Sequence, residues 1–118
     1  MACDLDNYLK PATFSFKFLQ VKEVNKLHEV VTSFIFSKFL TKEESTALAD
    51  ISNDIAELGI KTLNLSTDPE AAESDFGWVK ISRGFHGMRA IKVANGSSLP
   101  QSQKSKLKRD LQRFTNQS

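Results

Sequence analysis

The chain has 118 residues, 40% of them hydrophobic and 25% charged, with a net charge of +2, which is typical of a globular domain rather than of a disordered segment. Its single cysteine, Cys3, excludes an internal disulfide and a cysteine-based zinc site. The start lacks the basic and apolar segments of a signal peptide, and the longest apolar stretch, near residues 34–36, is too short to cross a bilayer. We expect a cytoplasmic protein with no membrane contact, built as a loosely ordered lead-in over residues 1–10 and one domain over residues 11–118.

The first predicted element is a strand over residues 13–21. Phe14, Phe16 and Phe18 alternate there with polar residues. A period of two places the three rings on one side of an extended chain, so the pattern predicts a strand with one buried face.

Two helices are predicted next. Residues 22–40 carry apolar side chains at helical spacing, although the β-branched and aromatic run over residues 30–36 leaves a strand there as an open alternative. Thr41 and Glu44 have the spacing of a capping box, and Gly59 is a typical C-terminal stop. The stripe that this second helix would bury consists of Leu48, Ile51, Ile55 and Leu58.

The chain then favours short strands. We expect a strand over residues 60–65 and an exposed acidic loop over residues 66–75. Residues 78–82 and 88–93 are predicted to form a hairpin, because the glycines within residues 83–87 permit a tight reversal.

The last element is a predicted C-terminal helix. Asn95 and Gly96 form a turn signal, Ser98 and Gln101 have the spacing of a second capping box, and Pro100 fits a first helical turn. Its apolar stripe consists of Leu107, Leu111 and Phe114. Together the elements predict an α+β fold, with an antiparallel sheet of three to four short strands packed against about three helices.

Charge is segregated along the chain. Residues 42–75 hold nine acidic residues against two lysines, a net charge of −7. Residues 76–118 hold nine basic residues against one aspartate, a net charge of +8. A field of one sign attracts polyanions or the opposite charge of a protein surface, unless the two segments compensate each other within the fold.

The basic third carries two candidate nucleic-acid sites. On the predicted hairpin, aromatic rings would stack on bases while neighbouring cations meet phosphates. The other interpretation is that the indole is core and the lysines are solvated. The C-terminal helix would add phosphate contacts that do not depend on sequence. The candidate residues are Trp78, Lys80, Arg83, Phe85, Arg89, Lys92, Lys104, Lys106, Lys108, Arg109 and Arg113.

The sequence offers little for catalysis. His28 and His86 lie in no metal-spaced motif, and the nucleophile and phosphate-loop motifs of known enzyme classes are missing. We therefore expect a non-catalytic regulatory protein, without metal or cofactor, that binds RNA or single strands. The alternative is a protein-interaction module or inhibitor that docks through its acidic or basic segment. A homodimer is compatible with both, because opposite charges favour self-association.

Overall fold

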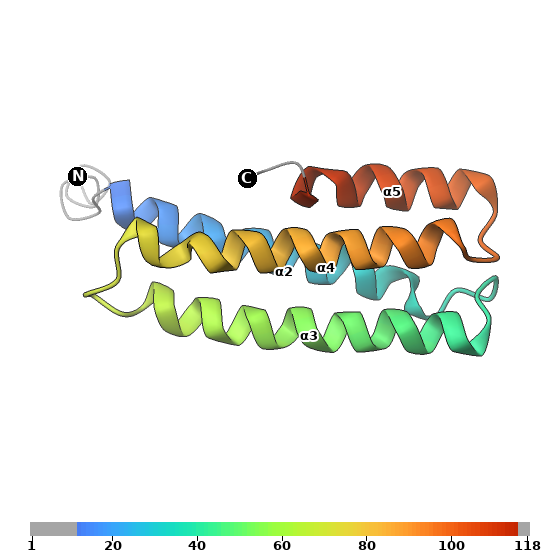
Figure 1. Cartoon of the computed structure of the whole chain (residues 1–118), viewed down its shortest axis with the longest axis horizontal. Helices are drawn as coiled ribbons and strands as arrows, with labels where there is room; N and C mark the ends of the chain where they lie inside the picture. Colours follow the sequence, from blue (N-terminus) through green and yellow to red (C-terminus); the bar gives the residue numbers. More distant parts are fainter. Residues whose placement is uncertain (1–11, 116–118) are drawn as a thin grey trace, which may run out of the picture.

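A computed structural model describes residues 12–115, with side chains placed from residue 16 onward (Figure 1). Four α-helices make up the described part, and it contains no strand, so the predicted α+β class is wrong. The elements are α2 (Ala12–Ile35), α3 (Lys42–Ser66), the short 3₁₀ helix η1 (Glu73–Phe76), α4 (Gly77–Asn95) and α5 (Gln101–Thr115).

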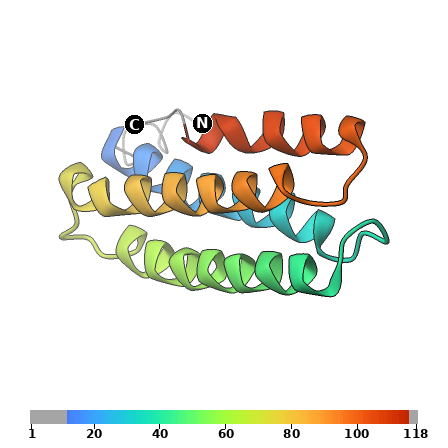
Figure 2. The same ribbon diagram turned by 45° about the vertical axis from the view of Figure 1, so that its right-hand side comes forward.

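The helices run up and down, and α4 lies between α3 and α5 (Figures 1 and 2). The most extensive packing joins α2 to α3 and α4 to α5, while α3 also packs on α4. The long α2 lies behind this layer and contacts the other three helices. One side of α4 therefore faces the core, and the opposite side faces outward between its two neighbours.

Helix α2 replaces the predicted strand over residues 13–21, and its helical conformation continues to Ile35. The helix predicted over residues 22–40 is thus confirmed as far as Ile35 and wrong over residues 36–40, and the strand alternative over residues 30–36 is wrong. The reason lies in the buried face, which repeats at intervals of three and four residues. That face consists of Lys17, Gln20, Val24, Leu27 and Val31.

The start of α3 agrees with the sequence. Thr41 Oγ1 accepts the Glu44 N–H at 3.1 Å, and Glu44 Oε1 accepts the Thr41 N–H at 2.9 Å, so the capping box is confirmed. The predicted apolar stripe from Leu48 to Leu58 is buried. Gly59 does not end the helix, which extends to Ser66, so the strand predicted over residues 60–65 is wrong.

Helix α4 replaces the predicted hairpin. Its buried positions again recur every three to four residues, and several hold very small side chains that allow neighbouring helices to approach. A Cβ on Gly87 would lie 3.1 Å from Thr115 Cγ2, so this glycine serves close contact with α5 rather than a chain reversal. The buried residues of α4 are Val79, Arg83, Gly87, Ala90 and Ala94.

Helix α5 carries the predicted apolar stripe, and Leu107, Leu111 and Phe114 are all buried. The turn signal is also confirmed, because α4 ends at Asn95 with Gly96 as its C-cap. The capping box expected between Ser98 and Gln101 is not formed by their side chains. The Gln101 side-chain amide instead donates to Ser105 Oγ at 3.3 Å.

Candidate nucleic-acid interface

Helix α5 presents a basic surface at the edge of the bundle. Its apolar stripe is buried, and this places the intervening positions in solvent. Five basic residues and a single acid, Asp110, lie on this helix. The basic residues are Lys104, Lys106, Lys108, Arg109 and Arg113.

Two of these five cations have partners within the protein. Arg113 Nη2 donates to both carboxylate oxygens of Glu23 on α2, at 2.8 and 2.9 Å. Lys104 Nζ donates to the Asn95 carbonyl oxygen at the end of α4, at 3.2 Å. No hydrogen bond or ion pair within the described residues holds Lys106, Lys108 or Arg109, and all three are exposed. These three cations are available to a ligand.

The two aromatic candidates, Trp78 and Phe85, lie on α4 and are not part of the basic surface of α5. Trp78 is exposed beside α3, where it borders a shallow hollow of about 270 Å³ together with Asp54 and Glu57. Phe85 is also exposed, and the Arg89 guanidinium lies 5.8 Å from the centre of its ring. Lys61 also borders this hollow and pairs with Glu57 at 3.4 Å, so charges of both signs surround the indole.

The remaining cations predicted for the hairpin lie on two sides of α4. Lys80 Nζ lies 4.9 Å from the centre of the Phe16 ring on α2, and Lys92 is exposed in the last turn of α4. Arg89 forms an ion pair of 2.7 Å with Asp54 on α3. The predicted hairpin is wrong, but α4 still places Trp78, Phe85, Arg89 and Lys92 on one face at intervals of seven, four and three residues, while Lys80 lies on another side.

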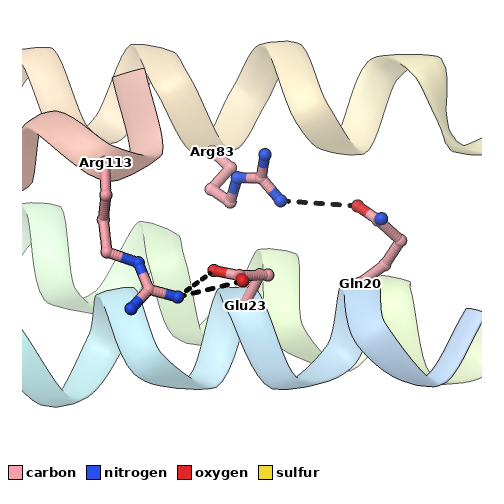
Figure 3. A network of polar contacts seen from close by, with 4 residues as sticks. All are labelled: Gln20, Glu23, Arg83 and Arg113. Carbon is pink, nitrogen blue, oxygen red and sulfur yellow. Dashed lines mark hydrogen bonds and ion pairs between the residues drawn. The ribbon is translucent and has the colours of Figure 1, made fainter. Parts of the chain in front are cut away.

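Arg83 occupies the core instead of a binding surface. Its side chain is only 2% exposed, and Nη1 donates to Gln20 Oε1 at 3.4 Å (Figure 3). The guanidinium lies between Gln20 and the Glu23–Arg113 ion pair. Burial lowers the pKa of Arg83, the nearby Glu23 carboxylate raises it, and the like charge of Arg113 lowers it further. This network joins α2, α4 and α5.

Sequence reasoning missed the polar residues of this network. Gln20 is buried, the Glu23 side chain is largely covered, and Lys17 donates to the Asp68 carbonyl oxygen at 3.0 Å. A signal was present, because Lys17 and Gln20 fit the same three-and-four spacing as the valines and leucine of α2. Because polar residues are seldom buried without partners, the polar character of Lys17 and Gln20 argued against placing them on the buried face.

The fold also separates the two charged segments. Helix α3 carries five acids against two lysines, and α4 separates it from the basic α5 (Figure 2). At one end of the bundle, Glu44 Oε1 of α3 accepts the N–H of Ser98, in the loop between α4 and α5, at 3.3 Å. Hydrogen bonds from backbone N–H groups, that of Thr41 above all, lower the pKa of Glu44, and Lys104 adds to this. Most of the basic face of α5 is thus not neutralised by α3.

His86 makes the stability of the protein sensitive to pH. Burial lowers its pKa from 6.5, Arg89 lowers it further, and Asp54 opposes them. The Arg89 Nη1 group also donates to Nδ1 at 3.2 Å, which requires a neutral ring. Because the unfolded chain binds the proton more readily, His86 costs no stability above pH 6.5 and destabilises the fold progressively below it.

We therefore expect the melting temperature to fall between about pH 7.5 and about pH 5.5, and the His86→Asn variant to show a smaller fall. Thermal unfolding followed by circular dichroism measures both. Equal pH profiles for the two proteins would contradict this role of His86.

Comparisons of the chain with protein-family models, with curated proteins and with solved structures found no match. Among the helices between residues 12 and 115, none combines the length and apolar character needed to cross a membrane. Functional inference therefore depends on the chemistry of the described surface.

Proposed function

We propose that the protein is a non-catalytic, cytosolic binding protein that holds the phosphate backbone of RNA or single-stranded nucleic acid on helix α5. The observation that carries this proposal is the exposed group of Lys106, Lys108 and Arg109 on one edge of the bundle. Cations in such positions replace condensed counterions on a phosphate chain, and the counterions released into solution drive binding.

Two features of the surface support the proposal. The acidic α3 lies on the far side of α4, so most of the α5 field is not cancelled within the molecule. Arg113 and Lys104 extend the basic row at either end, although each already has an internal partner. Since the contacts would involve phosphates alone, affinity should depend strongly on salt and weakly on base sequence.

The test is a binding titration with a labelled single-stranded RNA at low and at moderate salt. We expect the triple variant Lys106→Ala, Lys108→Ala and Arg109→Ala to lose roughly tenfold or more in affinity at low salt. Each phosphate contact to a single strand contributes about 0.7 to the slope of log K against log salt, so this slope should shrink by about 2.

A matched variant separates position from net charge. Lys22, Lys38 and Lys42 are exposed on α2, on the loop after it and on α3, so replacing these three by alanine removes the same charge from other surfaces. It should change affinity much less. Equal losses in the two triple variants would contradict a site on α5. If the wild-type protein does not bind at low salt, the proposal fails and a protein partner becomes the better explanation of the charge.

A further inference from the structure

The outward side of α4 carries a row of exposed apolar side chains. Trp78, Ile81, Phe85 and Met88 follow one another at intervals of three, four and three residues, which places them on one face of the helix. Their exposed fractions range from 42% to 75%. An exposed apolar row with polar flanks is characteristic of an interaction surface. We call it the α4 row.

A hollow of about 490 Å³ lies along one flank of the α4 row. Gly77 and Gly84 leave space there because they have no side chains, and Thr115 at the end of α5 borders it. Trp78 occupies the opposite flank, toward α3, at the same level of the helix. The surface therefore carries a large protruding ring on one side and an open hollow on the other.

The flanking helices have opposite charge. The acidic α3 runs along the Trp78 flank, and the basic α5 lies on the opposite flank, where it reaches the hollow with its last residue, Thr115 (Figure 1). The side of α5 nearest to the α4 row is marked by Lys104, which donates to Asn95 of α4. Lys108 lies one turn further along that side. One face of the molecule thus has an apolar centre between helices of opposite net charge. On the α3 flank beside Trp78, Asp54 and Glu57 are already paired with Arg89 and Lys61, so the acids of α3 that lack an ion pair within the described residues lie nearer its start.

We propose that the α4 row binds a second copy of this chain, with a twofold axis running along α4. Such an axis exchanges the two flanks of the row. It sets the acidic α3 of each copy opposite the basic α5 of the other, and it brings each Trp78 to the hollow of the other copy. Both the charges and the shapes are complementary in this arrangement.

The reverse arrangement, with the two α4 helices antiparallel, lacks both features. It sets α3 against α3 and α5 against α5, so like charges face each other. It also moves Trp78 to the level of Met88 in the other copy, away from the hollow. Only the parallel arrangement pairs helices of opposite charge and brings each Trp78 to the hollow of the other copy.

The apolar contact area points to a reversible dimer. An aromatic side chain covers roughly 150–250 Å² when it becomes buried, and a standard interface buries roughly 800 Å² on each partner. The α4 row therefore forms the centre of such an interface, and the charged flanks must supply the remainder. Since exposed charge pairs are screened, salt should weaken the dimer. Lys108 belongs both to this basic flank and to the cations proposed to bind nucleic acid, so the dimer and a nucleic-acid strand would compete for it, whereas Lys106 and Arg109 are used by the nucleic-acid proposal alone.

The test is sedimentation equilibrium of the full chain over a wide range of concentrations. We expect the wild-type mass to rise from one chain to two, at lower concentrations in low salt than in high salt. Gly77→Leu is designed to fill the hollow, and a Cβ at this position meets no atom within 4 Å, so the substitution introduces no clash at Cβ. Gly77→Leu and Ile81→Glu should each weaken association roughly tenfold or more.

Ile60→Glu is the matched control, because Ile60 is an exposed isoleucine on α3, outside the α4 row. It should associate as the wild type does. A wild-type protein that stays monomeric at every concentration in low salt overturns the proposal. Binding of an apolar dye to the α4 row does not rescue it, because the row would then serve another partner. Unchanged association of Gly77→Leu, or growth beyond two chains, overturns it as well.

Cross-linking tests the direction of pairing. In a Cys3→Ser background, Met88→Cys places one thiol on the α4 row. A short bismaleimide should join two chains at this position, because the twofold axis along α4 keeps both residues at the same level. The antiparallel arrangement separates them by the length of the row, so failure to cross-link a dimeric sample overturns the proposed axis.

Discussion

Phe114→Ala is expected to lower the free energy of unfolding by about 3–5 kcal/mol. Phe114 is fully buried and is one of three apolar side chains that hold α5 on the bundle. It lies against Gly87 of α4, where an added Cβ would be 3.8 Å from the Phe114 Cβ. The substitution leaves a cavity that this closely packed helix pair cannot readily collapse.

Urea denaturation of the variant measures the loss. Phe36→Ala is the control, because Phe36 is 93% exposed and its removal should change stability by less than about 0.5 kcal/mol. Equal effects of the two substitutions would contradict the buried position of Phe114. Because α5 is also the proposed binding surface, Phe114→Ala should weaken RNA binding in proportion to the unfolded fraction.

Arg83→Ala is the second substitution with a large expected effect, about 2–4 kcal/mol of lost stability. Truncation removes a long buried side chain and leaves the Gln20 amide oxygen without its donor. The Glu23 carboxylate keeps its ion pair with Arg113, so it does not become an isolated buried charge.

Arg83→Met separates volume from charge. Methionine fills most of the same space without a charge to desolvate, and buried ionic groups replaced by apolar ones of similar volume often lose little stability. We therefore expect Arg83→Met to lose clearly less than Arg83→Ala in the same denaturation experiment. If both variants lose the same free energy of unfolding, then the hydrogen bonds and charge of the Arg83 guanidinium, rather than the volume of the side chain, hold α2 and α4 together.

The elements that sequence reasoning placed correctly have local determinants. The Thr41–Glu44 box depends on groups three residues apart, and the stripes of α3 and α5 are regular over several turns. Such signals need no information from the rest of the chain. The turn at Asn95 and Gly96 belongs to the same class.

The elements that were wrong depend on distant packing. Phe16 was assigned to a strand face, yet it packs edge-on against Phe76, with ring centres 5.6 Å apart. Gly87 was assigned to a chain reversal, yet it provides the space that α5 occupies. Alternating aromatics and paired glycines are local signals for sheets and turns, and helix packing outweighed them.

The candidate site divides in the same way. Counting charges was enough to locate the basic third and the five cations of α5. It could not show that Arg83 is buried, that Arg89 pairs with Asp54 or that Arg113 pairs with Glu23. These pairings join residues far apart in the chain, and they distinguish cations available to a ligand from cations that hold helices together.

By itself, the sequence determined how much charge of each sign the protein carries, where the capped helix α3 begins and which side chains α5 buries. These properties depend on composition and on neighbours within one or two helical turns. Only the tertiary structure decided that residues 12–21 and 77–95 are helical, that α4 separates the acidic helix from the basic one and that the α4 row faces outward. The physical reason is that burial is shared among helices, so each conformation depends on the faces the other helices present.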